Sequence, residues 1–245
     1  MKKILLSHFY NEEYLLPFWL NHHKDMFDYG IMIDYNSTDN SCEIIKNICP
    51  NWKVYKSKNK YFSALEVDKE IIEYENNIDN GIYRICLNTT EFLIYNKKYA
   101  FEESKNRYLI PAFIMIDSYK EKYSDLNLKD SIINQRTNGI HYNKMFHFKK
   151  SRSFHNFKIE TYPLGRHFDQ YTTTDMVILW YGFSPFNKKL INRKLQIQNK
   201  IPFSDTQKGY GIHHVTNEKA LEKQYEELVQ NSCDLKNEIN RIIGE

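Results

Sequence analysis

The chain has 245 residues, of which 41% are hydrophobic, and its 34 basic residues against 31 acidic ones give a formal net charge of +3. This length and apolar content predict one α/β domain with a sizeable core, while so small a charge gives no field that would select nucleic acid or an anionic membrane. The four cysteines include no C-x-x-C pair and no apolar run reaches signal-peptide or membrane-spanning length, so we expect a cytoplasmic chain without a zinc site, disulfides or a membrane span.

The first ninety or so residues alternate strands with helices, which is the pattern of a mostly parallel sheet. Hydrophobic spacing predicts strands at residues 3–9, 29–34, 52–55 and 82–87, with helices at residues 13–24, 41–48 and 63–75 between them. The signal is less regular beyond residue 91, where strands are predicted at residues 108–116, 141–148 and 176–181. A polar stretch at residues 119–138 indicates an insertion or lid. Residues 218–243 predict a charged amphipathic helix with a break near Ser232.

Polar residues follow the first predicted strand, in the run Phe9-Tyr10-Asn11-Glu12. In an open α/β sheet, ligands bind outside the carboxyl ends of the strands, so these residues are placed to contact a nucleotide. The alternative is that Asn11 or Glu12 caps the next helix.

A second polar run, Asp34-Tyr35-Asn36-Ser37-Thr38-Asp39, directly follows the second predicted strand. Its carboxylate, amide and hydroxyl groups suit a ribose or a uracil, and we take Asp34, Asn36, Ser37 and Asp39 as candidate nucleotide ligands. A turn that caps the helix near Ser41 is the alternative, and both roles can coexist.

These two runs, with the residues between them, resemble the family 2 and related GT-A glycosyltransferases. The matching motifs are Asn11-Glu12, Leu15-Leu16-Pro17-Phe18-Trp19, His22-His23, Phe27-Asp28 and Asp34-Tyr35-Asn36-Ser37-Thr38-Asp39. The resemblance implies a single GT-A domain, a Rossmann-like and mostly parallel sheet flanked by helices. It also implies a nucleotide-sugar donor, most often a UDP-sugar, and a glycan or protein acceptor. On this basis residues 1–95 form a nucleotide-binding half, residues 96–217 an acceptor half, and residues 218–245 a C-terminal helix.

The chain departs from the family at the third motif, because Asn88-Thr89-Thr90-Glu91-Phe92 stands where relatives carry D-x-D-E-F. Asn88 and Thr90 keep the position of nucleotide ligands. Amide and hydroxyl groups, however, bind Mg²⁺ or Mn²⁺ much less well than carboxylates do. Glu91 is the acid that remains, either as a metal ligand or as a group that orients the loop.

A further resemblance lies near the C-terminus, in residues 179–184, the basic run 188–194 and residues 209–214. They are similar to the family's H-Y-x-x-x-S segment, basic helix and terminal histidine, but Trp180 replaces the first histidine. Three explanations stay open: Mn²⁺ or Mg²⁺ is dispensable, the donor site is lost, or a histidine compensates. The compensating candidates are His213, His214 and His167, and Glu91 with His213 and His214 forms a weak candidate metal site.

Two basic clusters are candidates for diphosphate recognition, since cationic side chains and metal ions can play the same electrostatic role. They are Lys144, Lys149, Lys150 and Arg152, and Lys188, Lys189, Arg193 and Lys194. We include Lys144 among the candidate nucleotide ligands, with a solvated surface as the alternative. The aromatic residues around the first cluster also suit single-stranded nucleic acid, but the chain has too little excess positive charge for that partner.

A transferase that inverts the sugar configuration needs a general base facing the acceptor hydroxyl. Asp205, Asp169 and Glu91 are our candidate catalytic carboxylates. Asp175 lies in the same half of the chain as Asp205 and Asp169, with His167 and His213 nearby in sequence, and no motif selects among them. The leading interpretation is an active glycosyltransferase, and the alternative is a non-catalytic nucleotide- or glycan-binding module on the same scaffold. Another α/β nucleotide enzyme is less favoured, because no G-x-G-x-x-G follows the first strand.

Overall fold

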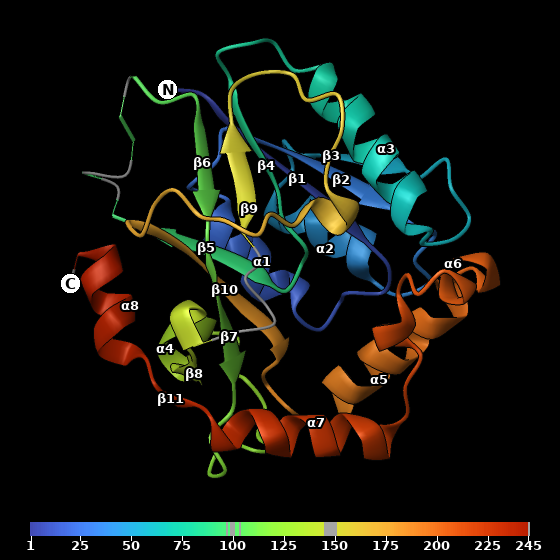
Figure 1. The fold of residues 1–245 in the computed structure, drawn as a ribbon, viewed down its shortest axis with the longest axis vertical. Coiled ribbons are helices and arrows are strands. Elements are labelled where there is room, and N and C mark those ends of the chain that lie inside the picture. The colour runs from blue at the N-terminus through green and yellow to red at the C-terminus, as the bar shows by residue number, and fades with distance from the viewer. Residues whose placement is uncertain (97, 99–100, 103, 145–150, 245) are drawn as a thin grey trace.

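Two β-sheets form the centre of the chain in the computed structural model, which describes residues 1–96, 98, 101–102, 104–144 and 151–244 (Figure 1). The strands are β1 (Lys3–Phe9), β2 (Tyr29–Asp34), β3 (Lys53–Lys56), β4 (Tyr83–Cys86), β5 (Glu91–Tyr95), β6 (Arg107–Ile110), β7 (Ala112–Ile116), β8 (Asn138–Ile140), β9 (Arg152–His155), β10 (Met176–Phe183) and β11 (Cys233–Asp234). The first sheet has the order β3-β2-β1-β4-β9-β6 and the second has the order β11-β8-β7-β10-β5.

Helices flank both sheets. The α-helices are α1 (Leu16–His23), α2 (Ser41–Ile48), α3 (Ala64–Asn76), α4 (Ile132–Gln135), α5 (Lys188–Ile197), α6 (Phe203–Gln207), α7 (Glu218–Gln230) and α8 (Lys236–Ile243). Short 3₁₀ turns are η1 (Tyr142–Lys144), η2 (Leu164–Arg166), η3 (Gln198–Lys200) and η4 (Ile212–His214). The predicted α/β class and single domain are confirmed.

The register of the first sheet aligns the ends of its parallel strands. Strand β1 pairs in parallel with β2 and β4, and Phe9 lies opposite Asp34 while Leu6 lies opposite Cys86. Strand β3 extends the parallel set on the other side of β2. The carboxyl ends of these strands therefore share one edge, as the predicted nucleotide site requires.

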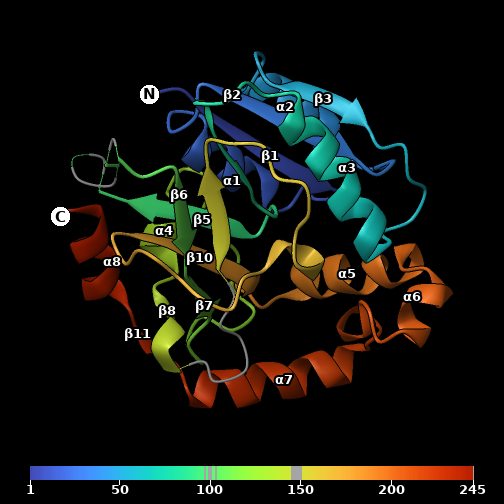
Figure 2. The same ribbon diagram turned by 45° about the horizontal axis from the view of Figure 1, so that its top comes forward.

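Alternation along β1 divides the core between two layers, because successive side chains of a strand point to opposite faces. Leu5 packs in the cluster that contains Trp19 of α1, whereas Leu6 packs in the cluster that contains Val67 and Ile71 of α3. Figures 1 and 2 show α3 lying across one face of the first sheet, with its lower end close to α6. Helix α1 starts at Leu16 rather than at residue 13, and Pro17 occupies its first turn, where a missing N–H costs little.

The strand predicted at residues 108–116 is wrong as a single element. Pro111 divides it into β6, which pairs with β9 in the first sheet, and β7, which pairs with β8 and β10 in the second. Proline has no N–H for a central ladder, so it is suited to the junction between two strands. Strands β5 and β9 were not predicted. Their four or five residues are all buried, and such short runs carry no alternation.

The predictions for the acceptor half and for the C-terminal segment are met only in part. Residues 142–144 of the strand predicted at 141–148 form the turn η1, and residues 145–148 lie outside the described residues. The polar stretch at residues 119–138 contains the short helix α4. The break near Ser232 is confirmed, because β11 separates α7 from α8 and pairs with β8.

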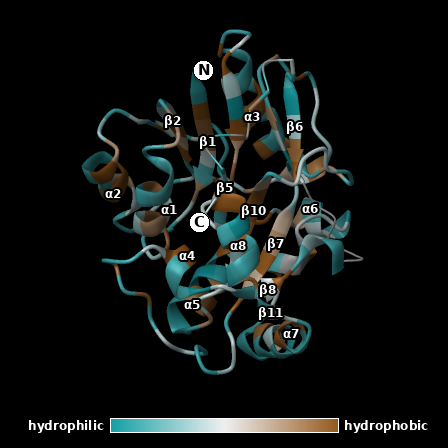
Figure 3. Cartoon of the chain, turned by 90° about the vertical axis from the view of Figure 1, so that its left-hand side faces the viewer, coloured by the Kyte–Doolittle hydropathy of each residue, from teal (hydrophilic) through white to brown (hydrophobic). Residues whose placement is uncertain are grey.

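One hydrophobic core joins the predicted parts of the chain. A single buried cluster runs from Leu5 of β1 to Ile239 and Ile242 of α8, and β5 pairs with β10 across the predicted boundary at residue 95. In Figure 3 the central strands β5 and β10 are brown, whereas α5 and α7 are largely teal. None of the helices in the described part of the chain is long and apolar enough to cross a bilayer.

Candidate functional site

The loops after β1 and β2 interlock at the shared strand edge. The Asn11 backbone N–H donates to Ser37 Oγ over 3.0 Å, and the Thr38 N–H donates to Asn11 Oδ1 over 2.7 Å. Asn11 and Asn36 have φ values of 51° and 62°, a left-handed conformation that asparagine adopts more readily than most residues. The polar runs after β1 and after β2, both part of the resemblance, therefore lie side by side.

Asp34 and Asp39 fulfil the turn and capping roles considered above. Asp34 Oδ1 accepts from the Ser37 N–H over 2.8 Å. The Asp39 carboxylate accepts from the Ser41 and Glu13 N–H groups, each over 3.0 Å. A carboxylate has about four acceptor positions, so these bonds leave capacity for a ligand.

The aromatic residues of the first motif differ in position. The Phe9 side chain is buried in the core and offers no surface to a ligand, which corrects its predicted contact role as far as the side chain is concerned. Tyr10 is half-buried, and Lys200 Nζ lies 4.2 Å from the centre of its ring. Tyr10 is therefore the aromatic residue of this motif that a base or ribose can reach.

Glu12 is buried and bonded to Arg193 of α5. Its two carboxylate oxygens accept from Arg193 Nε and Nη2 over 2.5 and 2.6 Å, and its N–H donates to Ser41 Oγ over 2.8 Å. Gln196 of the same helix donates to the Asn11 carbonyl over 3.0 Å. Glu12 thus anchors α5 beside the strand ends, and the structure gives it a structural task in place of the predicted ligand contact.

Glu91 is also buried and committed to an ion pair. Arg152 Nε and Nη2 donate to its two oxygens over 2.7 to 3.1 Å, and the Asn88 N–H donates to Oε2 over 2.7 Å. This is the loop-orienting role considered in the sequence. Asn88 Oδ1 is buried without a hydrogen-bond partner among the described residues. Thr90, two residues further along the chain, is also buried.

The residues at this position do not fit a divalent metal. A hard cation needs several oxygen ligands, and both Glu91 oxygens already accept from Arg152. Within the described ranges, no three or more histidine, cysteine or acidic side chains gather where they could hold an ion. His214 belongs to η4, and the side chain of His213 lies outside the described residues. We therefore derive no step through Mn²⁺ or Mg²⁺.

A charged cluster beside Glu91 was missed in the sequence. Arg166 of η2 pairs with Asp68 of α3, and both are buried. Burial, followed by the charges of Arg166 and Arg152, lowers the pKa of His8 well below its usual value. In the sequence this cluster was indicated only by His8, a histidine near the carboxyl end of the mostly apolar strand β1.

Asp205, a predicted catalytic residue, holds the N-terminus of α3. Its side chain is buried, and Oδ2 accepts from the Ala64 N–H over 2.8 Å. Ser63, at the N-cap position, makes no side-chain cap of its own. Figure 2 shows α6, which carries Asp205, close to that end of α3.

Replacing Asp205 by alanine should therefore lower the free energy of unfolding by about 1–2 kcal/mol, because the first turn of α3 loses its acceptor. Urea denaturation measures this loss. Asp175→Ala, at an exposed carboxylate, is the control and should change stability by no more than about 0.5 kcal/mol. Loss of transferase activity at unchanged stability would instead restore the catalytic role.

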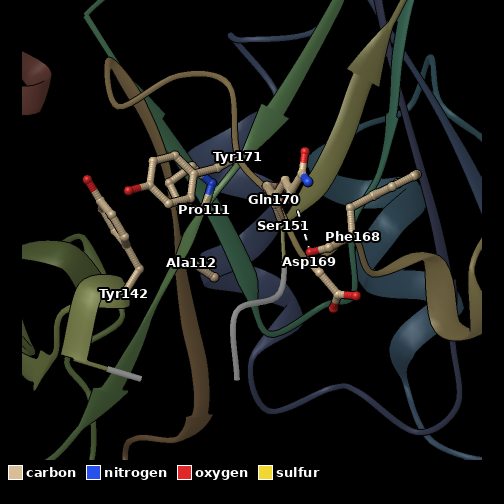
Figure 4. Close-up of a pocket in the computed structure, with 8 residues that line it drawn as sticks. All are labelled: Pro111, Ala112, Tyr142, Ser151, Phe168, Asp169, Gln170 and Tyr171. Atoms are coloured by element: carbon tan, nitrogen blue, oxygen red, sulfur yellow. Dashed lines mark hydrogen bonds between the residues drawn. The ribbon is translucent and has the colours of Figure 1, made fainter. Parts of the chain in front are cut away.

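Asp169 is the catalytic candidate that remains exposed. It lines a cavity of about 10 Å³, room for about one water, next to the rings of Tyr142 and Tyr171. In Figure 4 its carboxylate points away from those two rings. Lys144, the predicted cation of the first basic cluster, is exposed at the end of η1. Lys149 and Lys150 of that cluster lie outside the described residues.

Comparisons with known proteins find only distant likenesses. No protein-family model and no curated protein matches the chain. Among solved structures, S. aureus TarS 1-349 aligns at 13% identity over 64% of this chain and 47% of that one, with a TM-score of 0.38. TarS 1-349 in complex with UDP-GlcNAc aligns at 15% over 51% and 37%, with a TM-score of 0.33. The mannosyltransferase PcManGT from Pyrobaculum calidifontis, in complex with GDP-Man and Mn²⁺, aligns at 10% over 81% and 62%, with a TM-score of 0.42.

The chain thus spans less than two thirds of each of these structures. Fold and site together define an α/β domain with a Rossmann-like sheet, in which β3, β2, β1 and β4 are parallel and β9 is antiparallel to its neighbours, and a polar site at the carboxyl edge of the parallel strands.

Proposed function

We propose that this protein is a glycosyltransferase that moves a sugar from a nucleoside diphosphate donor, first of all a UDP-sugar, to a hydroxyl of a glycan or protein. The observation that supports it is that the loop after β1, which contains Asn11, is hydrogen-bonded to the loop after β2, which contains Ser37, at the carboxyl edge of the two strands. Those loops carry the motifs by which the chain resembles GT-A glycosyltransferases. Tyr10, Asp34 and Asn36 are the proposed nucleoside contacts.

The reaction places two demands on the site. The acceptor oxygen forms a bond to the anomeric carbon while the bond to the diphosphate oxygen breaks, so the diphosphate leaves with its negative charge. A base takes the hydroxyl proton, and cationic groups stabilise the leaving diphosphate. Asp169 is the proposed base, since it is the exposed carboxylate among the three candidates.

UDP should bind with an affinity that depends little on metal. Calorimetric titration with EDTA and with Mn²⁺ should give dissociation constants within about tenfold, or about 1.4 kcal/mol. Asp34→Ala should weaken binding at the carboxyl edge. Asp28→Ala is the matched control, because Asp28 accepts a backbone N–H from Lys3 over 2.8 Å at the opposite end of the same strands. Loss of binding in EDTA would show that a metal is required after all.

A second candidate is a nucleotide- or glycan-binding module without catalytic activity. The commitment of Glu91 to Arg152, together with Asn88, Thr90 and Trp180 at the positions of family ligands, favours it. Incubation of UDP-sugars with candidate acceptors separates the two functions. UDP binding without any release of UDP from the donors would support the binding module.

A further inference from the structure

Helix α5 and turn η3 bring a row of cations to the carboxyl edge of the first sheet. Three of them are paired with carboxylates. Lys188 contacts Glu218 over 2.8 Å and Lys189 contacts Asp125 over 3.0 Å, both at exposed positions. Arg193 is bonded to Glu12, as described above. These three charges are therefore already neutralised.

Lys194 differs from these three cations. Its ammonium lies 3.9 Å from the centre of the Phe183 ring, and no carboxylate of the described residues forms an ion pair with it. It is partly buried and lies against Phe183 at the end of β10, while Glu12, just after β1, is close enough to act on its charge.

Lys200 of η3 is the second cation of this row that forms no ion pair with a carboxylate of the described residues. Its ammonium donates to the Tyr35 carbonyl over 3.1 Å and lies above the Tyr10 ring. It therefore sits at the loops after β1 and β2, where the nucleoside is proposed to bind.

We propose that Lys194, assisted by Lys200, neutralises the diphosphate of the nucleotide donor at the carboxyl edge of the first sheet. This rests on the function proposed above and names the groups that take the place of a metal. An ammonium is a suitable partner for a phosphate, which it binds as a point charge.

The other buried cations near this edge are committed elsewhere. Arg152 is bonded to Glu91, and Arg166 is bonded to Asp68. Moving either onto a diphosphate would leave a buried carboxylate without its counter-ion, which is costly. Lys194 can bind an anion without breaking an existing ion pair.

The titration of Lys194 agrees with this role. Burial and the charge of Arg193 lower its pKa to about 7, although Glu12 acts in the opposite direction. The other charged or titratable groups on the elements packed against α5 are Lys200 of η3, His213 and His214 of η4, and several residues of α7, of which Glu218 pairs with Lys188. Those of α7 are Glu218, Lys219, Glu222, Lys223, Tyr225, Glu226 and Glu227. A diphosphate beside Lys194 favours the ammonium and raises this pKa. Above pH 7 the protein should therefore take up a proton when it binds the nucleotide.

The test is calorimetric titration of the whole chain with UDP in EDTA, between pH 7.5 and 9, in buffers of different ionisation enthalpy. UDP is fully ionised over this range, because the second pKa of a phosphate is about 6. The wild type should lose affinity as pH rises and should take up about 0.4 to 0.8 of a proton at pH 8, the uptake that a tenfold to hundredfold preference for the ammonium implies. Lys194→Met should bind about tenfold to a hundredfold more weakly and without proton uptake. Lys194→Arg should keep most of the affinity and lose its pH dependence.

Lys188→Met is the matched control, since it removes an exposed lysine of the same helix and should leave UDP affinity unchanged. Thermal unfolding of each variant reports whether it is folded. If UDP binds and neither Lys194 variant alters affinity or proton uptake, the role of Lys194 is overturned and the proposed function stands. If the wild type binds neither UDP nor GDP, the proposed function fails first.

Discussion

Replacing Arg152 by methionine should destabilise the protein by about 3–5 kcal/mol, because Glu91 is then left as a buried charge without a counter-ion. Both side chains of this pair are almost fully buried, at 3% and 6% exposure. Arg152 also donates to the Gly165 carbonyl over 2.6 Å, so the variant also loses this hydrogen bond between β9 and η2. Urea denaturation, monitored by circular dichroism, measures the loss.

The double variant Arg152→Met with Glu91→Gln should recover a large part of that loss, since it removes both charges. Arg241→Met is the matched control, because Arg241 also forms an ion pair, with Glu238, but at an exposed position. That change should cost no more than about 1 kcal/mol. If Arg152→Met is as mild as this control, Glu91 does not depend on Arg152 for its charge and is free to act in another role, including that of a metal ligand.

Glu75→Gln should raise the free energy of unfolding by about 3 kcal/mol at pH 8, because the native state buries a carboxyl group that prefers to be neutral. Burial raises the pKa of Glu75 from 4.5 to about 7, although a hydrogen bond from Tyr162 and the charges of Arg166 and Arg84 oppose the rise. One pKa unit corresponds to about 1.4 kcal/mol. Glutamine keeps an acceptor for the Tyr162 hydroxyl and removes the buried charge.

The direction in which stability changes with pH follows from proton binding to Glu75. Between pH 4.5 and 7 the native state holds a proton on Glu75 that the unfolded chain has already lost, so stability falls as pH rises through this range. The difference between wild type and Glu75→Gln, measured by urea denaturation from pH 4.5 to 8, should therefore grow with pH. Asp117, whose pKa burial raises to about 6, contributes a similar slope to both proteins and cancels in the difference.

Glu73→Gln provides the control for this series. Glu73 lies two residues earlier in α3, but its side chain is 57% exposed and pairs with Lys58 at the surface. Its removal should change stability by less than about 1 kcal/mol at every pH. A Glu75 variant that behaves like the Glu73 variant would show that Glu75 is ionised in the native protein at no cost.

The sequence by itself determined the first half of the fold. Strands at residues 3–9 and 29–34 and the helix at residues 41–48 were predicted at their observed bounds, because hydrophobic spacing and turn residues are local signals. The turn and capping bonds of Asp34 and Asp39 are also local, since their partners lie within a few residues or in the neighbouring loop. These features depend on few distant contacts, so the amino-acid pattern is enough to predict them.

Only the tertiary structure decided which charged residues are available to a ligand. Glu12 and Arg193 are separated by 181 residues, Ala64 and Asp205 by 141, and Glu91 and Arg152 by 61. No local pattern indicates such pairs, because a buried charge takes whichever counter-ion or N–H group the packed elements bring to it. The same packing leaves Lys194 without an ion pair to any carboxylate that the structure describes. The sequence could list the candidate cations, but only the fold distinguishes Lys194 and Lys200 from the cations of the same segment that are already paired with carboxylates.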